Sequence, residues 1–257
     1  MNTLSIGQAL IISIWIGLVM SRIFFGGATT TLRFTPMMTG LICGIVMKDV
    51  KTAMEVSAAI QLIYMGVFSP GGQMPSEPAI AAGIAVPVAL MSNLAPEAAV
   101  AVAVPVGLLG SYLYQFRFFV NTFIVKLTDK YAEEVNSSKL TFSIIVLPVL
   151  VSFVIFIPFM FVALYFGAPI IASLVESASG GLVFHVLTVI GGGLAAIGIA
   201  VTVYVIGKKN YIVFFLLAYF LTTMLKSLNI TNVTYAILGL LIAAIYVLGK
   251  KESSEAL

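Results

Sequence analysis

Charged residues are scarce in this sequence of 257 residues, because only 9% are Asp, Glu, Lys or Arg while 61% are hydrophobic. A water-soluble surface cannot be built from so few charges. The excess of positive charge is small, at a formal +3, and the basic residues stand in short clusters at the ends of apolar segments. The sequence therefore predicts an integral membrane protein and no nucleic-acid partner.

Cysteine and histidine each occur once, as Cys43 and His185. A single cysteine excludes an internal disulfide. The histidine lies in an apolar run whose nearest acid in the sequence is Glu176. Interhelical hydrogen bonding is therefore favoured for it over a role as proton relay or phosphoryl acceptor. We predict no catalytic residue, no metal site and no cofactor in this chain.

Apolar runs of about 17–25 residues recur along the chain, as expected of helices that cross a hydrocarbon core. They lack the alternation of a barrel strand, and lipid cannot satisfy backbone polar groups, so we predict helices. The expected fold is an all-α, polytopic helical bundle that forms one membrane-embedded domain over residues 1–257. The spans are expected at Leu4–Phe25, Ala98–Phe116, Phe142–Phe166, Gly181–Ile206, Tyr211–Leu225 and Val233–Leu248.

Lysines predict the orientation of these spans, since cytoplasmic loops of membrane proteins carry most of the positive charge. Lys126–Lys139 is expected inside the cell as a solvated loop, a docking surface for a soluble partner being the alternative. Arg117 is expected to close the preceding span, with its long stem snorkelling toward the interface. The turn Lys48–Lys51 lies on the same side only if Ala79–Ser92 is re-entrant.

The membrane pattern breaks in residues 36–93. Pro36–Met47 and Ala79–Ser92 are too short to span comfortably, and Ser69–Pro78 contains three prolines and two glycines, which end a helix. Irregular backbone at membrane depth occurs where it is buried in protein or lines a cavity. We therefore predict broken or re-entrant helices here, and we place the substrate site in this region.

Polar side chains in this region suit a sugar ligand. Ser57, Gln61 and Tyr64 follow one another at intervals of four and three, so they share one face of a helix. Their amide and hydroxyl groups match sugar hydroxyls, although bonds to neighbouring helices are the alternative. Glu77 is expected either to bind substrate or to hold its loop by accepting backbone N–H bonds. The same loop supplies the further candidates Ser69, Gln73 and Ser76.

Two features are expected to be structural. Asp49 can cap the helix that follows it through the N–H groups of Lys51 and Thr52. Gly40 and Gly44, four residues apart, permit the close approach of another helix.

Three stretches, Gly44–Thr52, Gln61–Gly66 and Pro70–Glu77, occur in an order and spacing that resemble one known family. It is the IIC subunit of the mannose/fructose/sorbose phosphotransferase systems, which includes N-acetylgalactosamine-type members. Length, helical character and the glycine-rich final third agree, so the resemblance covers essentially the whole chain.

The resemblance implies a sugar-translocating subunit in the bacterial inner membrane, with an elevator-type core that moves against a scaffold. It also implies that sugar bound outside is presented to a phosphorylated IIB subunit inside, and that IIC itself is not an enzyme. The implied partners are a IID membrane subunit, soluble IIA and IIB phosphocarriers, and a trimer of IIC–IID pairs. The alternative is an ion-coupled secondary sugar transporter, for which only Glu77 and Glu97 are candidate coupling acids.

Several positions depart from the mannose-type pattern, which has Gly in place of Lys48, Glu in place of Gln61, Asp in place of Glu77 and His-Arg-Pro in place of Phe34–Pro36. The change at Gln61 removes a charge from the expected sugar face. The resemblance therefore leaves the sugar open, with amino sugars and uronate-containing disaccharides as alternatives to mannose or glucose.

Overall fold

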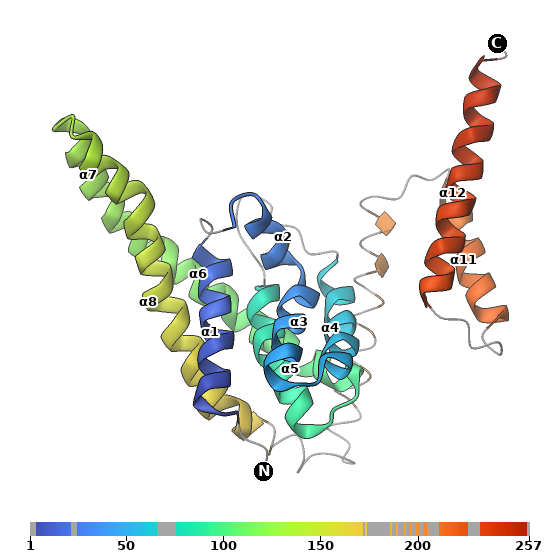
Figure 1. Cartoon of the computed structure of the whole chain (residues 1–257), viewed down its shortest axis with the longest axis horizontal. Helices are drawn as coiled ribbons and strands as arrows, with labels where there is room; N and C mark the ends of the chain where they lie inside the picture. The colour runs from blue at the N-terminus through green and yellow to red at the C-terminus, as the bar shows by residue number, and fades with distance from the viewer. Residues whose placement is uncertain are drawn as a thin grey trace. The chain divides into compact units, whose positions relative to one another are not determined.

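A computed structural model describes residues 4–21, 25–65, 76–171, 211–225 and 232–255, together with single residues between 173 and 204. Every regular element in these ranges is helical (Figure 1), which confirms the all-α prediction. The elements are α1 (Ile6–Ser21), α2 (Ala28–Phe34), α3 (Pro36–Met47), α4 (Val50–Tyr64), α5 (Pro78–Ser92), α6 (Pro96–Glu133), α7 (Ser137–Thr141), the π-helical turn η2 (Phe142–Val146), α8 (Leu147–Val162), the π-helical turn η3 (Ala163–Gly167), α11 (Ile212–Met224) and α12 (Asn232–Glu255).

The chain divides into two compact units, Met1–Thr202 and Val203–Leu257. The first contains α1 to α8, and the second contains α11 and α12. The expected span Gly181–Ile206 and the lone His185 lie largely outside the described residues, His185 entirely so. That residues 1–257 form one membrane-embedded domain stays a prediction.

Two helical stretches among the described residues are long and apolar enough to cross a membrane, Pro96–Glu133 and Ser137–Ile171. The short helix α2 and helix α3 pass the same test only as a pair, because they meet at a bend of 78°. Thr35 is extended at the bend and Pro36 is the first residue of α3, where a proline needs no N–H partner. The prediction of broken helices is thereby confirmed.

Helix α6 is longer than the sequence indicated. The span expected to end at Phe116 continues without a break to Glu133, a helix of 38 residues. Arg117 is 8% exposed, and its Nη1 donates to the carbonyl of Met20 at 2.9 Å. It therefore caps the last turn of α1 instead of snorkelling to an interface, which corrects the expectation for this residue.

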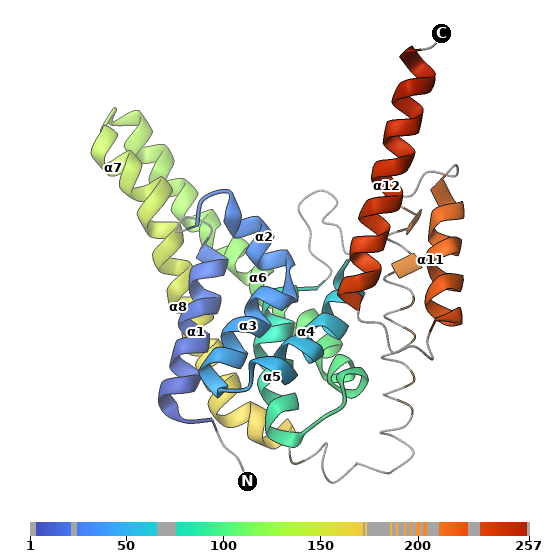
Figure 2. The same ribbon diagram turned by 45° about the vertical axis from the view of Figure 1, so that its right-hand side comes forward.

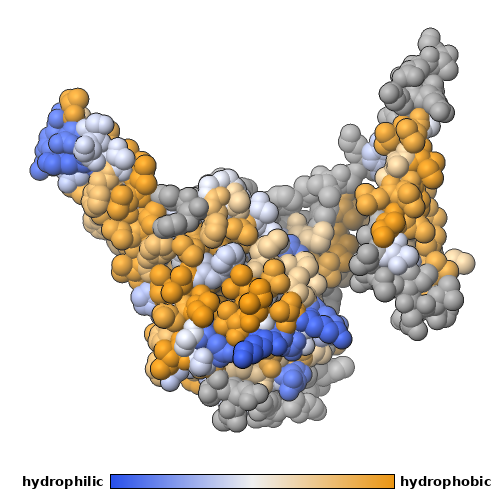
Figure 3. Space-filling view, viewed as in Figure 1, coloured by the Kyte–Doolittle hydropathy of each residue, from blue (hydrophilic) through white to orange (hydrophobic). Residues whose placement is uncertain are grey.

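The stretch Lys126–Lys139 is also helical, not a loop. It forms the last turns of α6, a short connection and the start of α7, at the tip of an arm that α6, α7 and α8 build (Figure 2). The sequence was misleading because Lys and Glu are also good helix formers, so a helix can continue where the hydrophobic run stops. In Figure 3 the arm is hydrophobic along its length and hydrophilic at its tip.

Helices α3 and α4 form a closely packed hairpin. The Asp49 carboxylate accepts the N–H of Thr52 at 3.1 Å, which confirms the predicted cap and lowers the pKa of the Asp49 carboxyl. A Cβ on Gly44 would stand 2.7 Å from the Cβ of Ala53, and one on Gly40 would collide with Ser57. The predicted close approach of a helix at these glycines is therefore present.

The direction of α5 bears on the expected path of the chain. The hydroxyl of Tyr64, at the end of α4, lies 3.1 Å from that of Ser76, just before α5, so the two helices pack antiparallel. Helix α5 therefore ends beside the α3–α4 turn, and α6 begins there (Figures 1 and 2). Whether Ala79–Ser92 is re-entrant in the membrane stays a prediction. The turn at Lys48 and the arm tip lie at opposite ends of α6.

Candidate substrate site

A buried ion pair connects the two places where the helices of the first unit are interrupted. Arg33 lies in the last turn of α2, and Glu77 immediately precedes α5. The Arg33 Nε donates to Glu77 Oε2 at 3.0 Å, and its Nη2 donates to Oε1. The two residues are 1% and 0% exposed. A paired arrangement with two hydrogen bonds is how a buried carboxylate is tolerated at such a place.

An aromatic ring completes this cluster. The Arg33 guanidinium carbon lies 3.8 Å from the ring centroid of Tyr114 on α6. A cation over an aromatic face is stabilised by the ring quadrupole, most strongly where water is excluded. The second terminal nitrogen of Arg33, Nη1, is buried and forms no hydrogen bond with the residues described here.

Two glycines of α6 allow the Glu77 segment to lie against that helix. The N–H of Glu77 donates to the carbonyl of Gly107 at 2.9 Å. A Cβ on Gly107 would collide with the hydroxyls of Tyr64 and Ser76, and one on Gly110 would lie 3.0 Å from the Glu77 Cβ. The segment before α5 is thus held from α2 on one side and from α6 on the other.

The polar face predicted on α4 divides into two kinds of side chain. Ser57 donates to the carbonyl of Met54 at 3.2 Å and packs against α3. Tyr64 shares a hydrogen bond with Ser76 and donates to the carbonyl of Ala103 at 3.4 Å. The Tyr64 hydroxyl thus bonds to a neighbouring helix, which was the alternative to substrate contact, whereas the Ser57 hydroxyl bonds within α4 itself.

Gln61 differs from its two neighbours on that face. Its Oε1 is buried and accepts no hydrogen bond from any residue that the structure describes. Among Ser57, Gln61 and Tyr64, Gln61 therefore has an acceptor without a partner in the described part of the chain. Ser69 and Gln73, the remaining predicted site residues, lie outside the described residues.

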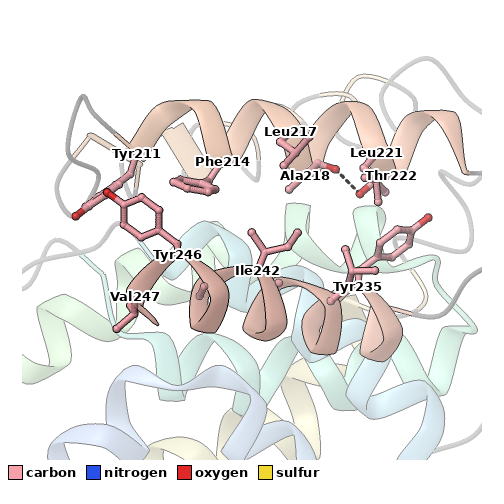
Figure 4. A pocket seen from close by; sticks show the side chains of 13 residues that line it. Tyr211, Phe214, Leu217, Ala218, Leu221, Thr222, Tyr235, Ile242, Tyr246 and Val247 are labelled. Atoms are coloured by element: carbon pink, nitrogen blue, oxygen red, sulfur yellow. Dashed lines mark hydrogen bonds between the residues drawn. The ribbon is translucent and has the colours of Figure 1, made fainter. Parts of the chain in front are cut away.

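The second unit contains a groove of a different character. It lies between α11 and α12, has a volume of about 370 Å³ and is lined mainly by apolar and aromatic side chains (Figure 4). Thr222, on its wall, donates to the carbonyl of Ala218 at 2.7 Å. This groove offers few polar groups, whereas the buried polar groups of the first unit include the Arg33–Glu77 pair and Oε1 of Gln61.

Comparison with known proteins decides the family. Residues 6–245 match the family described as the sorbose-specific IIC component of the PTS system. The chain belongs to this family. The predicted family is confirmed, and the chain is a membrane subunit for sugar transport rather than an enzyme.

Several characterised relatives agree with this assignment. The sorbose-specific EIIC component of Klebsiella pneumoniae is 23% identical over 82% of this chain and 78% of its own length. The N-acetylgalactosamine permease IIC component 1 of Escherichia coli is 23% identical over 80% and 76%. The mannose-specific EIIC component of the same species is 22% identical over 82% and 78%.

Two solved structures share the fold. A membrane protein structure superposes with a TM-score of 0.72 at 21% identity, covering 95% of this chain and 96% of the other. A cryo-EM structure of the mannose transporter ManYZ in complex with a microcin gives a TM-score of 0.56 at 18% identity, covering 96% of each chain.

Proposed function

We propose that this chain binds a sugar on the outer side of the bacterial inner membrane and presents it to a phosphorylated IIB subunit on the inner side. The proposed partners are a IID membrane subunit and soluble IIA and IIB phosphocarriers, with three IIC–IID pairs in the complex. The family assignment supports this role, and so does the likeness to a structure in which ManY and ManZ occur together. A phosphorylated sugar is charged and cannot recross the hydrocarbon, which would drive net uptake.

One observation carries the proposed position of the sugar: the buried Oε1 of Gln61 accepts no hydrogen bond within the described ranges of the chain. An unsatisfied buried acceptor costs about 1–3 kcal/mol, and a donating ligand group recovers part of that. Sugar hydroxyls are such donors. Gln61 is therefore the proposed direct contact, with Ser69 and Gln73 as further proposed contacts from the loop.

Glu77, Ser57 and Tyr64 are proposed to act differently. The Glu77 carboxylate is bound to Arg33, so it fixes the segment before α5 and offers the sugar only its remaining acceptor capacity. Ser57 and Tyr64 set the position of α4 through their contacts with α3 and α6. An elevator-type motion of this core against a scaffold is part of the same proposal.

The two candidate coupling acids, both among the described residues, do not favour the ion-coupled alternative. Such a transporter needs a coupling acid that can gain and lose a cation. Glu77 is neutralised by Arg33, and Glu97 is exposed in the first turn of α6.

Uptake of labelled sugars tests the proposed coupling. In cells that lack the general phosphotransferase protein, uptake through this chain and its partners should stop. Sugar accumulation that persists in those cells would contradict the proposed phosphotransferase mechanism and support ion coupling.

Substitution of Gln61 tests the proposed site. Gln61→Leu in the purified membrane complex should weaken sugar binding by roughly three- to tenfold, the loss expected for one hydrogen bond. Gln8→Leu is the matched control, because Gln8 Nε2 donates to the carbonyl of Val46 and serves helix packing. Equal affinity of Gln61→Leu and the wild-type complex would remove Gln61 from the site.

A further inference from the structure

Helix α2 carries two buried polar side chains on one face. Thr29 and Arg33 stand four residues apart, so they lie one helical turn from each other. They are 2% and 1% exposed, whereas Thr30 and Thr31 between them are exposed to solvent. Helix α2 packs against α1, α3 and α5. We call Thr29 and Arg33 the α2 pair.

Each member of the α2 pair has a polar atom without a partner among the described residues. These two buried atoms are Thr29 Oγ1 and Arg33 Nη1. Thr29 differs in this from the buried Ser13 of α1, whose hydroxyl donates to the carbonyl of Ala9 at 2.6 Å. Buried polar atoms are normally hydrogen-bonded, so two exceptions that lie one turn apart indicate a ligand that supplies the missing bonds.

The Arg33 guanidinium is held in a position that leaves Nη1 for a ligand. Its Nε and Nη2 form the edge that binds the Glu77 carboxylate. The Tyr114 ring, with its centroid 3.8 Å from the guanidinium carbon, covers one face of the plane. Because a guanidinium is rigid and planar, Nη1 points away from the edge that Glu77 occupies. Its position is fixed before a ligand arrives, so little conformational entropy is lost on binding.

The charges of Arg33 and Glu77 balance each other. Their side chains are 2% and 0% exposed, and together they present no net charge to a ligand. The carboxylate of a uronate would add a buried negative charge to a pair that is already neutral, which is unfavourable. A hydroxyl oxygen can accept from Nη1 and share a hydrogen bond with Thr29 without that cost. The chemistry of the α2 pair therefore suits an uncharged sugar unit.

A series of contacts connects the α2 pair with Gln61. Arg33 binds Glu77, and the preceding Ser76 shares a hydrogen bond with Tyr64. Tyr64 follows Gln61 by three residues on one face of α4. The segment before α5 is therefore contacted from both α2 and α4, the helices that carry these unpartnered atoms.

We propose that the α2 pair binds the hydroxyl groups of an uncharged sugar, with Arg33 Nη1 as a donor and Thr29 Oγ1 as a donor or an acceptor. Helix α2 then contributes to the sugar site in addition to α4. The inference rests on the proposed sugar binding by this chain, and it excludes a uronate at this position.

Thr29→Val tests the proposal with little risk to folding, because it keeps the shape of the side chain and removes only the hydroxyl. Labelled mannose, sorbose and N-acetylgalactosamine are the probes. In the purified membrane complex, the dissociation constant of whichever probe binds should rise about three- to tenfold, without a lower midpoint of thermal unfolding. Thr39→Val is the matched control, because its hydroxyl accepts the Nε1–H of Trp15 at 3.2 Å. It should lower the midpoint and keep the sugar affinity.

Arg33→Lys addresses the other member of the pair. Lysine keeps the positive charge beside Glu77 but has no second terminal nitrogen, so the affinity should fall about tenfold. Arg117→Lys is the matched control, because Arg117 Nη1 donates to the carbonyl of Met20 and joins α6 to α1. Equal losses of affinity in the two lysine variants would overturn a direct contact by Arg33.

Three further outcomes would overturn the proposal. They are wild-type affinity in Thr29→Val, binding of none of the three probes, and galacturonate that displaces the bound sugar better than galactose does. If Thr29→Val keeps its affinity while uptake still depends on the general phosphotransferase protein, the proposed function stands and the α2 contact is refuted.

Discussion

Lys48 shows strain at the scale of a single residue. It ends α3 with φ 63° and ψ 27°, the left-handed conformation, while the N–H of Asp49 donates to the carbonyl of Gly44 at 2.9 Å. This is the position at which helices commonly end in glycine. The left-handed conformation thus gives a physical reason for the Gly that mannose-type members have at this position.

Replacing Lys48 tests that reason. Lys48→Gly should raise the stability of the purified protein by about 1 kcal/mol, because a residue without a Cβ is not strained in this conformation. The measurement is the midpoint of thermal unfolding in detergent. Lys48→Ala removes the same charge but keeps a Cβ and should give no gain. A similar gain in both variants would point to charge and not to backbone strain.

The Arg33–Glu77 pair should be more sensitive to removal of one partner than of both. Arg33→Met leaves the Glu77 carboxylate in a buried place without its guanidinium, a change that typically costs about 3–5 kcal/mol. The double variant Arg33→Met/Glu77→Leu leaves neither charge and should recover most of the thermal stability. Losses that simply add in the double variant would show that the two residues act independently.

The sequence predicted part of the site at this scale. Glu77 was predicted as a site residue because it is an ionisable residue in the interrupted region, where an unpaired carboxylate is costly. Its partner Arg33 was missed, because the two are 44 residues apart and only the tertiary fold brings them together. Periodicity likewise placed Ser57, Gln61 and Tyr64 on one face but could not show which hydroxyls were already bonded. Their roles in sugar binding stay predictions.

At the scale of helices, the hydropathy of the sequence predicted the positions of helices better than their lengths. Pro36–Met47 was expected and is found with the same bounds as α3, since proline and the left-handed Lys48 fix its ends. Helix α6 runs 17 residues beyond the expected end at Phe116. The length of a hydrophobic run reflects the thickness of the membrane, whereas a helix ends where its backbone hydrogen bonds end.

The glycines of α3 give a testable case of helix packing. Gly44→Ala should destabilise the protein by about 1–3 kcal/mol, because the new Cβ would lie 2.7 Å from the Cβ of Ala53 and 2.8 Å from the Cα of Val50. Gly167→Ala is the matched control, since a Cβ there meets no atom within 4 Å. Thermal unfolding of the two variants compares them directly. Equal midpoints would show that α3 and α4 can separate without loss.

At the scale of the whole molecule, the path of the chain changes which charges share a side of the membrane. Lysine counting placed the Lys48–Lys51 turn with Lys126–Lys139 only if Ala79–Ser92 is re-entrant. Because α4 and α5 run antiparallel and α6 starts beside the turn, these two clusters stand at opposite ends of α6. The positive-inside rule then assigns the inner side to Lys126–Lys139, which carries the larger share of lysines.

Labelling from each side of the membrane checks this arrangement. In a Cys43→Ala background, Lys51→Cys and Ser138→Cys place exposed thiols at the two ends of α6. A membrane-impermeant maleimide should modify Lys51→Cys in intact cells or right-side-out vesicles, and Ser138→Cys only in inside-out vesicles. Modification of both from one side would contradict the path of α4 and α5. Modification from opposite sides but with the two positions exchanged would keep that path and reverse the orientation, placing the arm tip outside and out of reach of a cytoplasmic phosphocarrier.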